Sequence, residues 1–514
     1  MLQIYNSQTR RKEPFVPVDP DGHRVGLYYC GPTVYDSLHL GHVRAAVVPD
    51  IMRRYLEHCG YSVRYVSNFT DIDDKIIRRA IRENRSWREV TVIYMEEYYR
   101  LISAIGNRPP DVQPRATDHV PEMHQLIENL LDSGNGYVAS DGDVYFDTAS
   151  DDDYGSLSGR KLDEQRVGAS GRMTEAQMAV KRSPGDFILW KLLRNDPEDL
   201  KAAGEQVPRW PSPWGDGRPG WHLECSALSA KYLGMPFDIH GGGRDLIFPH
   251  HENEKAQNDC GYCGSLGDDG ESVKFWVHNG FLTLDARNET ERGDEYTEGD
   301  QAKMSKSLGN VWWLKDTIWP LGAYDPMAVR MLMVQSHYRS PIRFSQDLLD
   351  QAGQRVERIY RIVERLRDGL SRDDSHGVSE AAGRAVSEAR SAFQSAMDDD
   401  FGTPGGLAAI DGLIHASKDF LSRGDDGVAA ADRLFLADAI VNLCRILGLR
   451  AERLGDGPPG DEGPDELLGL IAELRSQARA AKDWATADRI RDRLSELGWE
   501  IRDGEGGASD IVKN

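Results

Sequence analysis

Residues 25–69 read VGLYYCGPTVYDSLHLGHVRAAVVPDIMRRYLEHCGYSVRYVSNF, and this stretch decides the fold. The β-rich run GLYYC ends at a Gly-Pro pair, helical spacing of apolar residues follows over 40–58, and a partly alternating strand, YSVRYVSNF, comes next. A strand–helix–strand unit of about 40 residues is typical of the opening of a parallel α/β sheet. Pro49 lies inside the helical stretch and predicts a kink or a broken turn there.

The whole chain has 514 residues, too many for one hydrophobic core, so we expect two to four domains. A polar, irregular stretch, which includes SDGDVYFDTAS as one arm of a hairpin, predicts an insertion between two halves of the sheet. After about residue 345 the pattern is helical, and a Gly-, Pro- and acid-rich linker precedes a last small unit. We expect the two sheet halves at 1–110 and 216–310, with the insertion at 111–215 between them. A connecting region at 311–350 leads to the helical domain at 351–450, and the linker at 451–464 leads to the last small unit at 465–514.

The charge balance is strongly acidic, with a formal net charge of −22. Taken alone this disfavours a nucleic-acid partner, because phosphate binding requires Lys and Arg, so any RNA contact must come from local basic faces. One such face is predicted in the helical domain, where four arginines follow helical spacing: Arg355, Arg358, Arg361 and Arg365. The acidic composition fits either adaptation to high salt or an ordinary acidic cytosolic protein.

Six cysteines in a chain of this length do not predict a disulfide framework. No apolar run approaches the roughly 20 residues that span a bilayer, and the N-terminal residues lack the apolar segment of a secretion signal. We therefore expect a cytoplasmic protein without a membrane partner, whose cysteines are core thiols, metal ligands or catalytic groups.

The first chemical motif is His39-Leu40-Gly41-His42, where the first strand passes into its helix. A helix N-terminus offers free N–H groups and the positive end of the dipole, both suited to phosphate. The histidines add donors, and the glycine lets a flat ring approach the backbone. By itself this motif is equally consistent with surface histidines at a helix start.

The second motif is Lys303-Met304-Ser305-Lys306-Ser307. Two lysines and two hydroxyls on a flexible segment can close over a triphosphate and neutralise its developing charge. Alone, such a run is often a solvated loop. Together with the histidine motif, in this order and about 260 residues apart, it is typical of class I aminoacyl-tRNA synthetases.

A third constellation predicts a metal site from distant segments: Cys30, Cys225, His250 and Glu254. Two thiolates, an imidazole and a carboxylate form a suitable zinc set, and an i, i+4 spacing places His250 and Glu254 on one helix face. For either cysteine alone a buried core thiol is the better interpretation. We expect His251 on the helix surface. The pair Cys260-x-x-Cys263 stays open as a rival metal site, although a second pair is missing.

Several stretches together resemble bacterial-type cysteinyl-tRNA synthetases over almost the whole chain. They are YNSQTRRKEPFVP, YYCGPTVYDSLHLGH, NFTDIDDKII, GWHLECSAL, DIHGGGRDLIFPHHENEKAQ, KMSKSLGN, HYRSPI, DDDFGTP and the tail WATADRIRDRL. The resemblance implies an α/β, Rossmann-like class I catalytic domain with an insertion, a stem-contact region, an all-α helical tRNA-binding domain and a small C-terminal anticodon-binding unit. It also implies one Zn²⁺ per chain on the third constellation, with the substrate thiolate bound directly to the metal.

The reaction that the resemblance implies joins L-cysteine to ATP, used with Mg²⁺, to give cysteinyl-AMP, and then transfers cysteine to tRNA(Cys). His39, Gly41 and His42 would bind ATP, and Lys306 with Lys303 would hold the pyrophosphate. Because serine differs from cysteine by one atom, a soft metal discriminates where pocket shape cannot. Nothing in the sequence requires more than a monomer.

Further residues take family positions near the amino acid and the tRNA. Thr33, Thr70, Trp221 and His240 match positions near the cysteine and its adenylate, and Trp484, Asp488, Arg489 and Arg491 match the anticodon-binding tail. An exposed Trp beside arginines suits stacking on unpaired bases. For both tryptophans a place in the core is an equally good interpretation.

One segment departs from the family pattern, and three rival functions remain to be weighed. Residues 286–302 form an acidic insertion before the lysine motif, which we interpret as a surface loop that lengthens the arm of the lid. The nearest rival function is the related cysteine ligase of mycothiol synthesis, which lacks a C-terminal anticodon unit. A zinc hydrolase would leave the lysine motif without a purpose, and an RNA-binding protein without catalysis would leave the lysines and metal ligands idle.

Overall fold

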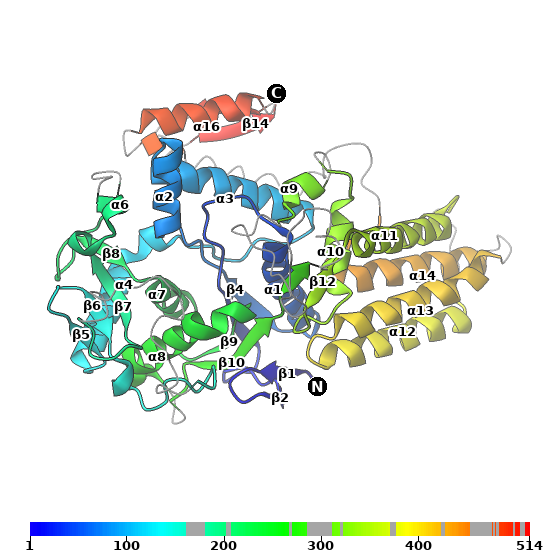
Figure 1. The fold of residues 1–514 in the computed structure, drawn as a ribbon. Coiled ribbons are helices and arrows are strands. Elements are labelled where there is room, and N and C mark those ends of the chain that lie inside the picture. Colours follow the sequence, from blue (N-terminus) through cyan, green and yellow to red (C-terminus); the bar gives the residue numbers. More distant parts are fainter. Residues whose placement is uncertain are drawn as a thin grey trace, which may run out of the picture.

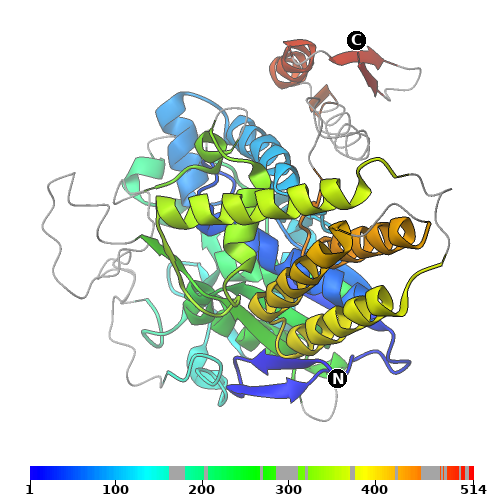
Figure 2. The ribbon, with the colours of Figure 1, turned by 90° about the vertical axis from the view of Figure 1, so that its right-hand side faces the viewer.

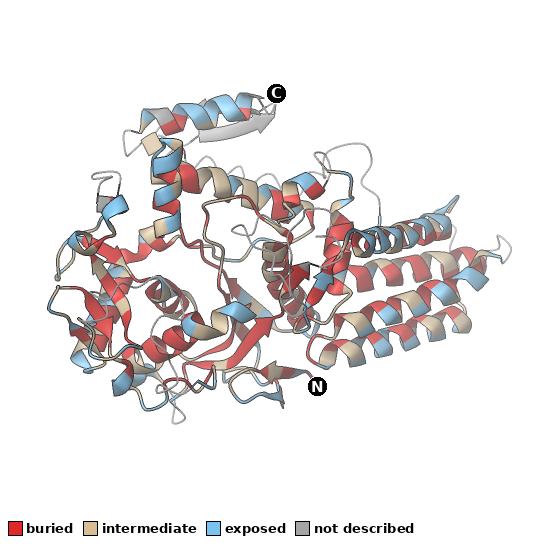
Figure 3. Ribbon diagram, in the orientation of Figure 1, coloured by how far each residue is buried: buried red, intermediate tan, exposed pale blue. Residues whose placement is uncertain are grey.

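The computed structural model describes residues 1–160, 180–201, 207–266, 270–284, 311–318, 322–370, 377–422, 427–452, 475, 478–479, 483–496, 499–503 and 509–513. Figure 1 shows a central sheet with a smaller antiparallel sheet on one side and a bundle of long helices on the other. Buried residues concentrate in the central sheet and on the inward faces of the bundle helices (Figure 3). The predicted α/β fold followed by a helical domain is confirmed.

The central sheet is parallel and has the strand order β10-β9-β3-β4. Its strands are β3 (Arg24–Tyr29), β4 (Ser62–Val66), β9 (Phe237–Gly243) and β10 (Val273–Asn279). The chain moves outward from β3 to β4 and in the opposite direction from β9 to β10. The carboxyl ends of β3 and β9 therefore flank a topological switch point, which is where open α/β sheets bind ligands.

Helix α1 (Leu40–His58) connects β3 to β4 as predicted and continues through Pro49 as one element, so the alternative of a broken turn is wrong. A proline removes one helical hydrogen bond and displaces a carbonyl of the preceding turn. Close to this point the side-chain amide of Asn107 donates to the carbonyl oxygen of Ala46 at 2.7 Å. This contact supplies a donor to the turn that precedes the proline.

Gly31 allows two segments to meet at the end of β3. A Cβ atom at this position would lie 1.6 Å from the carbonyl oxygen of Asn68, so only glycine fits. The Gly31 N–H donates to the side-chain oxygen of Asn68 at 3.0 Å, and the Cys30 N–H donates to the carbonyl of Gly241 at 3.0 Å. These contacts hold Cys30 at the switch point.

The insertion forms its own antiparallel sheet of order β5-β6-β7-β8. It contains α4 (Val120–Asp132), β5 (Gly136–Val138), β6 (Val144–Phe146), β7 (Phe187–Leu192), α6 (Glu198–Lys201) and β8 (Gly217–Pro219). The predicted hairpin arm, residues 140–150, contains β6, which pairs with β5 in an antiparallel hairpin. Helix α7 (Trp221–Leu233) follows β8 and leads the chain back to β9, so it brings Cys225 to the central sheet.

The helical bundle after the catalytic half is clearest in Figure 2. Its long helices are α11 (Gln346–Arg367), α12 (Glu380–Asp398), α13 (Thr403–Leu421) and α14 (Gly427–Ile446). Ser345 caps α11 by accepting from the Leu348 N–H, and Ser379 caps α12 in the same way through Ala382. Apolar residues on one face of each helix build the bundle core, which leaves the charged faces exposed.

The remaining elements complete the frame. They are β1 (Gln3–Asn6), β2 (Arg11–Pro14), α2 (Asp74–Glu83), α3 (Trp87–Ala104), α8 (Glu252–Gly261), β11 (Leu282–Leu284), α9 (Leu314–Thr317), α10 (Pro326–Val334), β12 (Ile342–Phe344), α16 (Trp484–Glu496), β13 (Trp499–Asp503) and β14 (Ser509–Lys513). Among the described residues, none of the helices has the length and apolar character that crossing a membrane requires.

Candidate active site

Four side chains from three separate segments converge at the switch point of the central sheet. Cys30 follows β3, Cys225 lies in α7, His250 lies in the turn Ile247–His251 and Glu254 lies in the first turn of α8, which follows that turn directly. One ligand atom from each lies within 4.8 Å of the others. Cys225, His250 and Glu254 are at most 1% exposed, and Cys30 is 9% exposed. The structure thus brings together the set predicted from sequence.

The spacing of these atoms fits zinc. Zn–S bonds of about 2.3 Å and Zn–O bonds of about 2.1 Å put two sulfurs of a tetrahedral site about 3.8 Å apart, and a sulfur about 3.6 Å from an oxygen. The Sγ atoms of Cys30 and Cys225 are 3.7 Å apart, and Cys30 Sγ is 3.6 Å from Glu254 Oε1. His250 Nε2 lies 2.8 Å from the same Oε1, which is shorter than the separation of two ligands of one ion. In this structure these two atoms form an ion pair with each other.

The electrostatics of the set also favour a cation. Burial alone would raise the pKa of the Cys225 thiol. The hydrogen bond from the Cys30 thiol outweighs burial and lowers this pKa to about 6. Burial is likewise unfavourable to a charged Glu254, but His250 and His240 hold the pKa of this carboxyl well below its usual value. Burial and the adjacent Cys225 raise the pKa of Cys30 well above that of a free thiol. A thiolate and a carboxylate in one buried cluster are anionic electron-pair donors that suit a cation such as zinc.

Trp221 and His222 cover the outer side of His250. The Trp221 ring stacks on the His250 ring with centroids 4.2 Å apart, and the indole is 38% exposed, so the interpretation of a core aromatic is wrong. His222 Nδ1 lies 2.8 Å from His250 Nδ1. Burial and His250 lower the pKa of His222 well below its usual value, so a neutral His222 can accept the Nδ1 proton of His250. Burial disfavours a charged His250, but Glu254, whose Oε1 contacts Nε2, raises the pKa of His250 to about 10, so a metal at Nε2 would take the place of that proton.

A second group of histidines lies on the other side of Cys30. His240 Nε2 is 3.4 Å and His251 Nε2 is 3.3 Å from Cys30 Sγ, and both can join Cys30 and Glu254 in an alternative metal set. His251 is fully buried and its Nδ1 lies 2.7 Å from His278 Nε2, so the prediction of a surface histidine is wrong. The reason is that His251 directly precedes α8, most of whose residues are buried against α7 and the insertion helix α4.

Two threonines follow β3 and β4 at the carboxyl edge of the central sheet, the edge that is called the crevice below. Thr33 and Thr70 form a parallel bridge, in which the Val34 N–H donates to the Thr70 carbonyl at 3.2 Å. The Thr70 hydroxyl donates to Glu224 of α7 at 2.9 Å. Burial, followed by the neighbouring Cys225, raises the pKa of Glu224 well above its usual value. Glu224 was not predicted from sequence, and it ties the segment after β4 to the helix that carries Cys225.

The histidine motif caps α1 through its own side chains. His39 is the N-cap, and its Nδ1 accepts from the Gly41 N–H at 3.1 Å, while His42 Nδ1 accepts from the His39 N–H at 3.3 Å. The two rings stack with centroids 3.7 Å apart. A Cβ atom at Gly41 would lie 2.9 Å from the His39 ring, which explains the glycine. Both imidazoles are therefore held at the helix N-terminus, beside the crevice.

Comparison with known proteins matches these features to one family. Residues 16–354 match the family described as tRNA synthetases class I (C) catalytic domain, and residues 392–452 match the DALR domain. The chain is 42% identical to the cysteine–tRNA ligase of Magnetococcus marinus, over 98% of this chain and 97% of the relative. The chain belongs to the class I cysteine–tRNA ligase family.

Other members of the ligase family show the same extent of similarity. The enzyme of Halorhodospira halophila is 43% identical over 98% of both chains, and that of Pelotomaculum thermopropionicum is 40% identical over 98% of both. Among solved structures, methionyl-tRNA synthetase of Mycobacterium tuberculosis with methionyl-adenylate matches with a TM-score of 0.56 at 14% identity, over 82% of this chain and 92% of that chain. An Agrobacterium radiobacter LeuRS complex with tRNA and LeuAMS matches with a TM-score of 0.55 at 12% identity, over 94% and 95%. These structures support the fold.

Some predicted ligase residues lie apart from the crevice or outside the described residues. Lys303 and Lys306 lie outside them, as does the acidic insertion 286–302. On α16, Trp484 is 58% exposed, so its interpretation as a core residue is wrong. Asp488, Arg489 and Arg491 are exposed on the same helix, where Arg489 pairs with Glu89 and Arg491 with Asp488 at 2.8 Å.

In the rival pair, Cys260 is half-buried and Cys263 is exposed. Neither cysteine joins a metal-binding group among the residues that the structure describes.

The residues that sequence reasoning missed are His222, Glu224 and His278. The first two adjoin predicted residues in GWHLEC, and the third lies in the strand KFWVHN, where a histidine on a buried strand is the available signal.

Proposed function

We propose that this chain activates L-cysteine with ATP to cysteinyl-AMP and transfers the cysteinyl group to tRNA(Cys). The observation that carries the proposal is the buried Cys30–Cys225–His250–Glu254 set beside the His39–His42 helix terminus, at the switch point of a parallel sheet. One end of this crevice suits a thiol and the other suits phosphate, and cysteine activation needs both.

Selection of cysteine over serine is assigned to the metal set. Zinc bound there supplies a soft Lewis acid that favours a thiolate over a hydroxyl. The protein side of the selection is rigid, because His222 orients His250 and Glu224 fixes Thr70 beside Cys225. Trp221, stacked on His250 and part-exposed, is placed to cover the bound amino acid and exclude water. His240, buried against Cys30 and Glu254, lines the inner wall.

On the nucleotide side, His39 and His42 bind the phosphates of ATP, with the N–H groups at the start of α1 behind them. Gly41 lets the adenine-bearing half approach the backbone. Lys303 and Lys306 hold the pyrophosphate as charge develops. These groups act by position and charge, so no general base is required.

The acceptor is assigned to tRNA rather than to the amino sugar of mycothiol synthesis. The helical bundle, the match of residues 392–452 to the DALR domain and the C-terminal unit with an exposed Trp484 support this choice. A ligase for a small acceptor has no use for basic helix faces so far from the crevice. The enzyme works on Mg²⁺-bound ATP and as a monomer.

The test is ATP–pyrophosphate exchange with cysteine or serine, followed by cysteine transfer to total tRNA. We expect exchange with cysteine alone, zinc at one per chain, and a loss of at least about 100-fold in exchange for Cys225→Ser. Cys59→Ser, at an exposed cysteine, is the matched control and keeps wild-type rates. Exchange without charging points to another acceptor, and absence of exchange refutes the proposed function.

A further inference from the structure

Asn68 lies at the carboxyl edge of the central sheet, just after the end of β4. Its side chain is fully buried, so the hydrogen bonds of its amide decide what it does there. The backbone on both sides of it is fixed. The Ser67 N–H donates to the Val112 carbonyl at 3.2 Å, and the next bond runs from the Phe69 N–H to the Pro114 carbonyl at 2.9 Å. The amide is therefore presented from a rigid segment.

The amide oxygen of Asn68 contacts the segments of both cysteines of the metal set. It accepts from the N–H of Gly31, the residue after Cys30, at 3.0 Å. The same oxygen lies 3.7 Å from Cys225 Sγ, in contact with it. The two cysteines are 195 positions apart in the chain and come from different elements. One side chain thus bridges the strand that carries one sulfur and the helix that carries the other.

The amide nitrogen of Asn68 extends this bridge. Its Nδ2 donates to Thr70 Oγ1 at 3.3 Å, and the Thr70 hydroxyl donates to Glu224 at 2.9 Å. Glu224 directly precedes Cys225 on α7, so the contacts return to the helix where the amide oxygen already touches the sulfur. These contacts form a ring around the two sulfurs, which lie 3.7 Å apart.

An amide suits this position because it accepts on one side and donates on the other. The Gly31 N–H can only donate, so it fixes the oxygen of Asn68 on its side and leaves the NH₂ group for Thr70. A carboxylate here would add an anion beside two sulfurs and Glu254. An aliphatic side chain of the same shape would leave the Gly31 N–H without its partner.

We propose that Asn68 is a positioning residue that sets the distance between the two cysteine ligands of the metal set. The inference rests on the proposed function, because it concerns the metal that selects cysteine in that proposal. Metal sites tolerate deviations of only about 0.2 Å in their bond lengths, and groups that hold the ligands in place therefore tune the affinity. Asn68 acts through Gly31 and Cys225, and so controls both the retention of the metal and the fit of the substrate thiol.

The experiment measures the zinc affinity of the full-length protein by competition with a chromophoric chelator. Asn68→Leu keeps the approximate shape of the side chain but neither accepts nor donates. We expect its zinc affinity to be about 10–100-fold weaker than that of wild type, the range found when a group that supports a metal ligand is lost. In the Co²⁺-loaded protein the visible d–d bands should shift and weaken, since they report the geometry of the site.

Pyrophosphate exchange at saturating Zn²⁺ gives an independent readout. We expect KM for cysteine to rise about 10-fold in Asn68→Leu, because the substrate thiol meets a distorted site. KM for ATP should change less than about 2-fold, since the histidine motif lies outside the ring of contacts. A merely structural defect would lower the amount of active enzyme and leave both KM values unchanged.

Asn6→Leu is the matched control. Asn6 is 4% exposed, and its amide oxygen accepts from the Trp276 N–H at 3.2 Å, while its nitrogen donates to the Lys274 carbonyl at 2.9 Å. It joins β1 to β10 by the same kinds of bond, through backbone groups rather than through a cysteine of the metal set. Its melting temperature should fall, but its zinc affinity should stay within about 2-fold of wild type.

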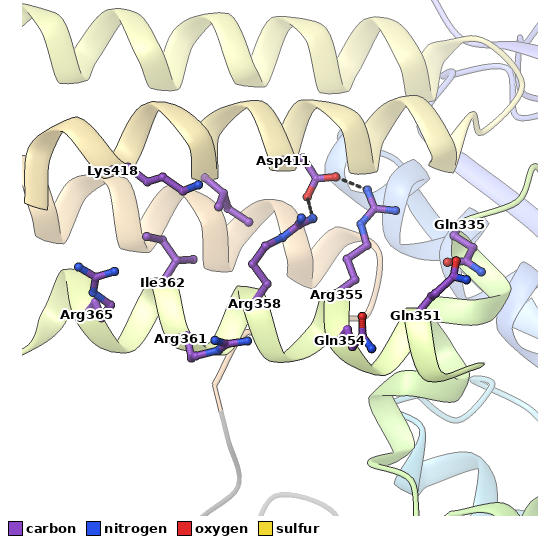
Figure 4. A pocket seen from close by; sticks show the side chains of 11 residues that line it. Gln335, Gln351, Gln354, Arg355, Arg358, Arg361, Ile362, Arg365, Asp411 and Lys418 are labelled. Carbon is purple, nitrogen blue, oxygen red and sulfur yellow. Dashed lines mark hydrogen bonds and ion pairs between the residues drawn. The ribbon is translucent and has the colours of Figure 1, made fainter. Parts of the chain in front are cut away.

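A second control lies in the helical bundle. Figure 4 shows the groove between α11 and α13, where the four arginines that the sequence predicts as a basic face line one wall. Asp411 of α13 pairs there with Arg355 and Arg358. Asp411→Asn weakens both pairs away from the metal set, so it should change the zinc affinity less than about 2-fold.

Each outcome decides the matter. If Asn68→Leu does not fold, Asn68→Ser takes its place, since its hydroxyl is too short to reach both Gly31 and Thr70. If wild type binds one zinc and exchanges, but the Asn68 variant keeps its zinc affinity, Co²⁺ spectrum and KM for cysteine, the inference is overturned and the proposed function stands. Equal losses of zinc affinity in Asn68→Leu and Asn6→Leu also overturn it. Wild-type protein that neither binds zinc nor exchanges refutes the proposed function, and the inference with it.

Discussion

Replacement of Asp50 by Asn tests how helix α1, which carries the histidine motif, is anchored. Asp50 is 1% exposed, and its carboxylate accepts from Arg330 Nη2 at 2.5 Å, Arg54 Nε at 2.9 Å and the Arg108 N–H at 3.2 Å. Arg330 of α10 is fully buried and also donates to the Leu447 carbonyl at 2.8 Å. Asp50 is therefore the anion that permits a buried guanidinium at the junction of the catalytic domain and the bundle.

The magnitude follows from what the substitution leaves behind. Removing one partner of a buried ion pair costs about 3–5 kcal/mol, because the remaining charge is uncompensated. An asparagine oxygen still accepts one hydrogen bond, and Arg54, 13% exposed, can turn to water. We therefore expect Asp50→Asn to lower the free energy of opening of α1 by about 2–4 kcal/mol.

The pH dependence has a definite sign. Burial raises the pKa of Asp50, but Arg330 and Arg54 outweigh it and hold this pKa below its usual value. A carboxyl with a depressed pKa in the folded protein contributes stability above its unfolded pKa of about 4, and loses it as pH falls through the folded pKa. Wild type and Asp50→Asn should therefore differ from pH 7 down to about pH 4, and converge only as pH falls further, through the depressed folded pKa.

Hydrogen exchange of the peptide spanning residues 40–58 is the assay, since it reports local opening without a two-state assumption for the whole chain. Asp399→Asn is the matched control, because that carboxylate is 67% exposed and pairs with Lys12 on the surface. We expect the control to change protection by less than about 0.5 kcal/mol. A cost below about 1 kcal/mol for Asp50→Asn at pH 7 refutes the reasoning.

Two further predictions concern the metal set and the loop beside it. Dialysis against a chelator should lower the melting temperature and abolish exchange, and added Zn²⁺ should restore both; an unchanged melting temperature with zinc removed would contradict a buried site. Glu252→Gln should loosen residues 155–158, because buried Glu252 accepts from the N–H groups of Gly155 at 3.0 Å and Ser158 at 2.7 Å. A cost of about 1–3 kcal/mol should speed trypsin cleavage after Arg160 by about 5–100-fold, with exposed Glu128→Gln as control, and equal cleavage rates count against the clamp.

The parts of the fold that depend on neighbouring residues could be predicted from the sequence. The unit β3–α1–β4 follows from local spacing, and α1 has the predicted bounds. The continuity across Pro49 could not be predicted, because the contact from Asn107 to the Ala46 carbonyl comes from a residue 61 positions away. Local rules state the cost of a proline, whereas tertiary contacts decide whether it is compensated.

The same limit applies to the site. The metal set could be predicted because its four residues match the zinc ligands implied by the family resemblance. Spacing alone left a buried core thiol as the better interpretation of either cysteine. His251 was placed on the surface because a histidine at a polar helix is more often exposed than buried. That expectation fails because His251 directly precedes α8, most of which is buried, so both His250 and His251 lie beside Cys30. Burial around a short helix depends on the whole sheet.

A single loop, residues 337–340, links helix α1, which carries the histidine motif, to the helical bundle. Arg44 of α1, fully buried, donates to the carbonyls of His337, Tyr338 and Ser340. On the other side Asp400, between α12 and α13, accepts from the Tyr338 hydroxyl at 2.7 Å and from Arg339 at 2.6 Å. Both anchors are buried charged groups, whose displacement would leave a charge unpaired. The loop therefore holds the bundle and the histidine helix in one fixed relation through buried charged groups on both of its sides.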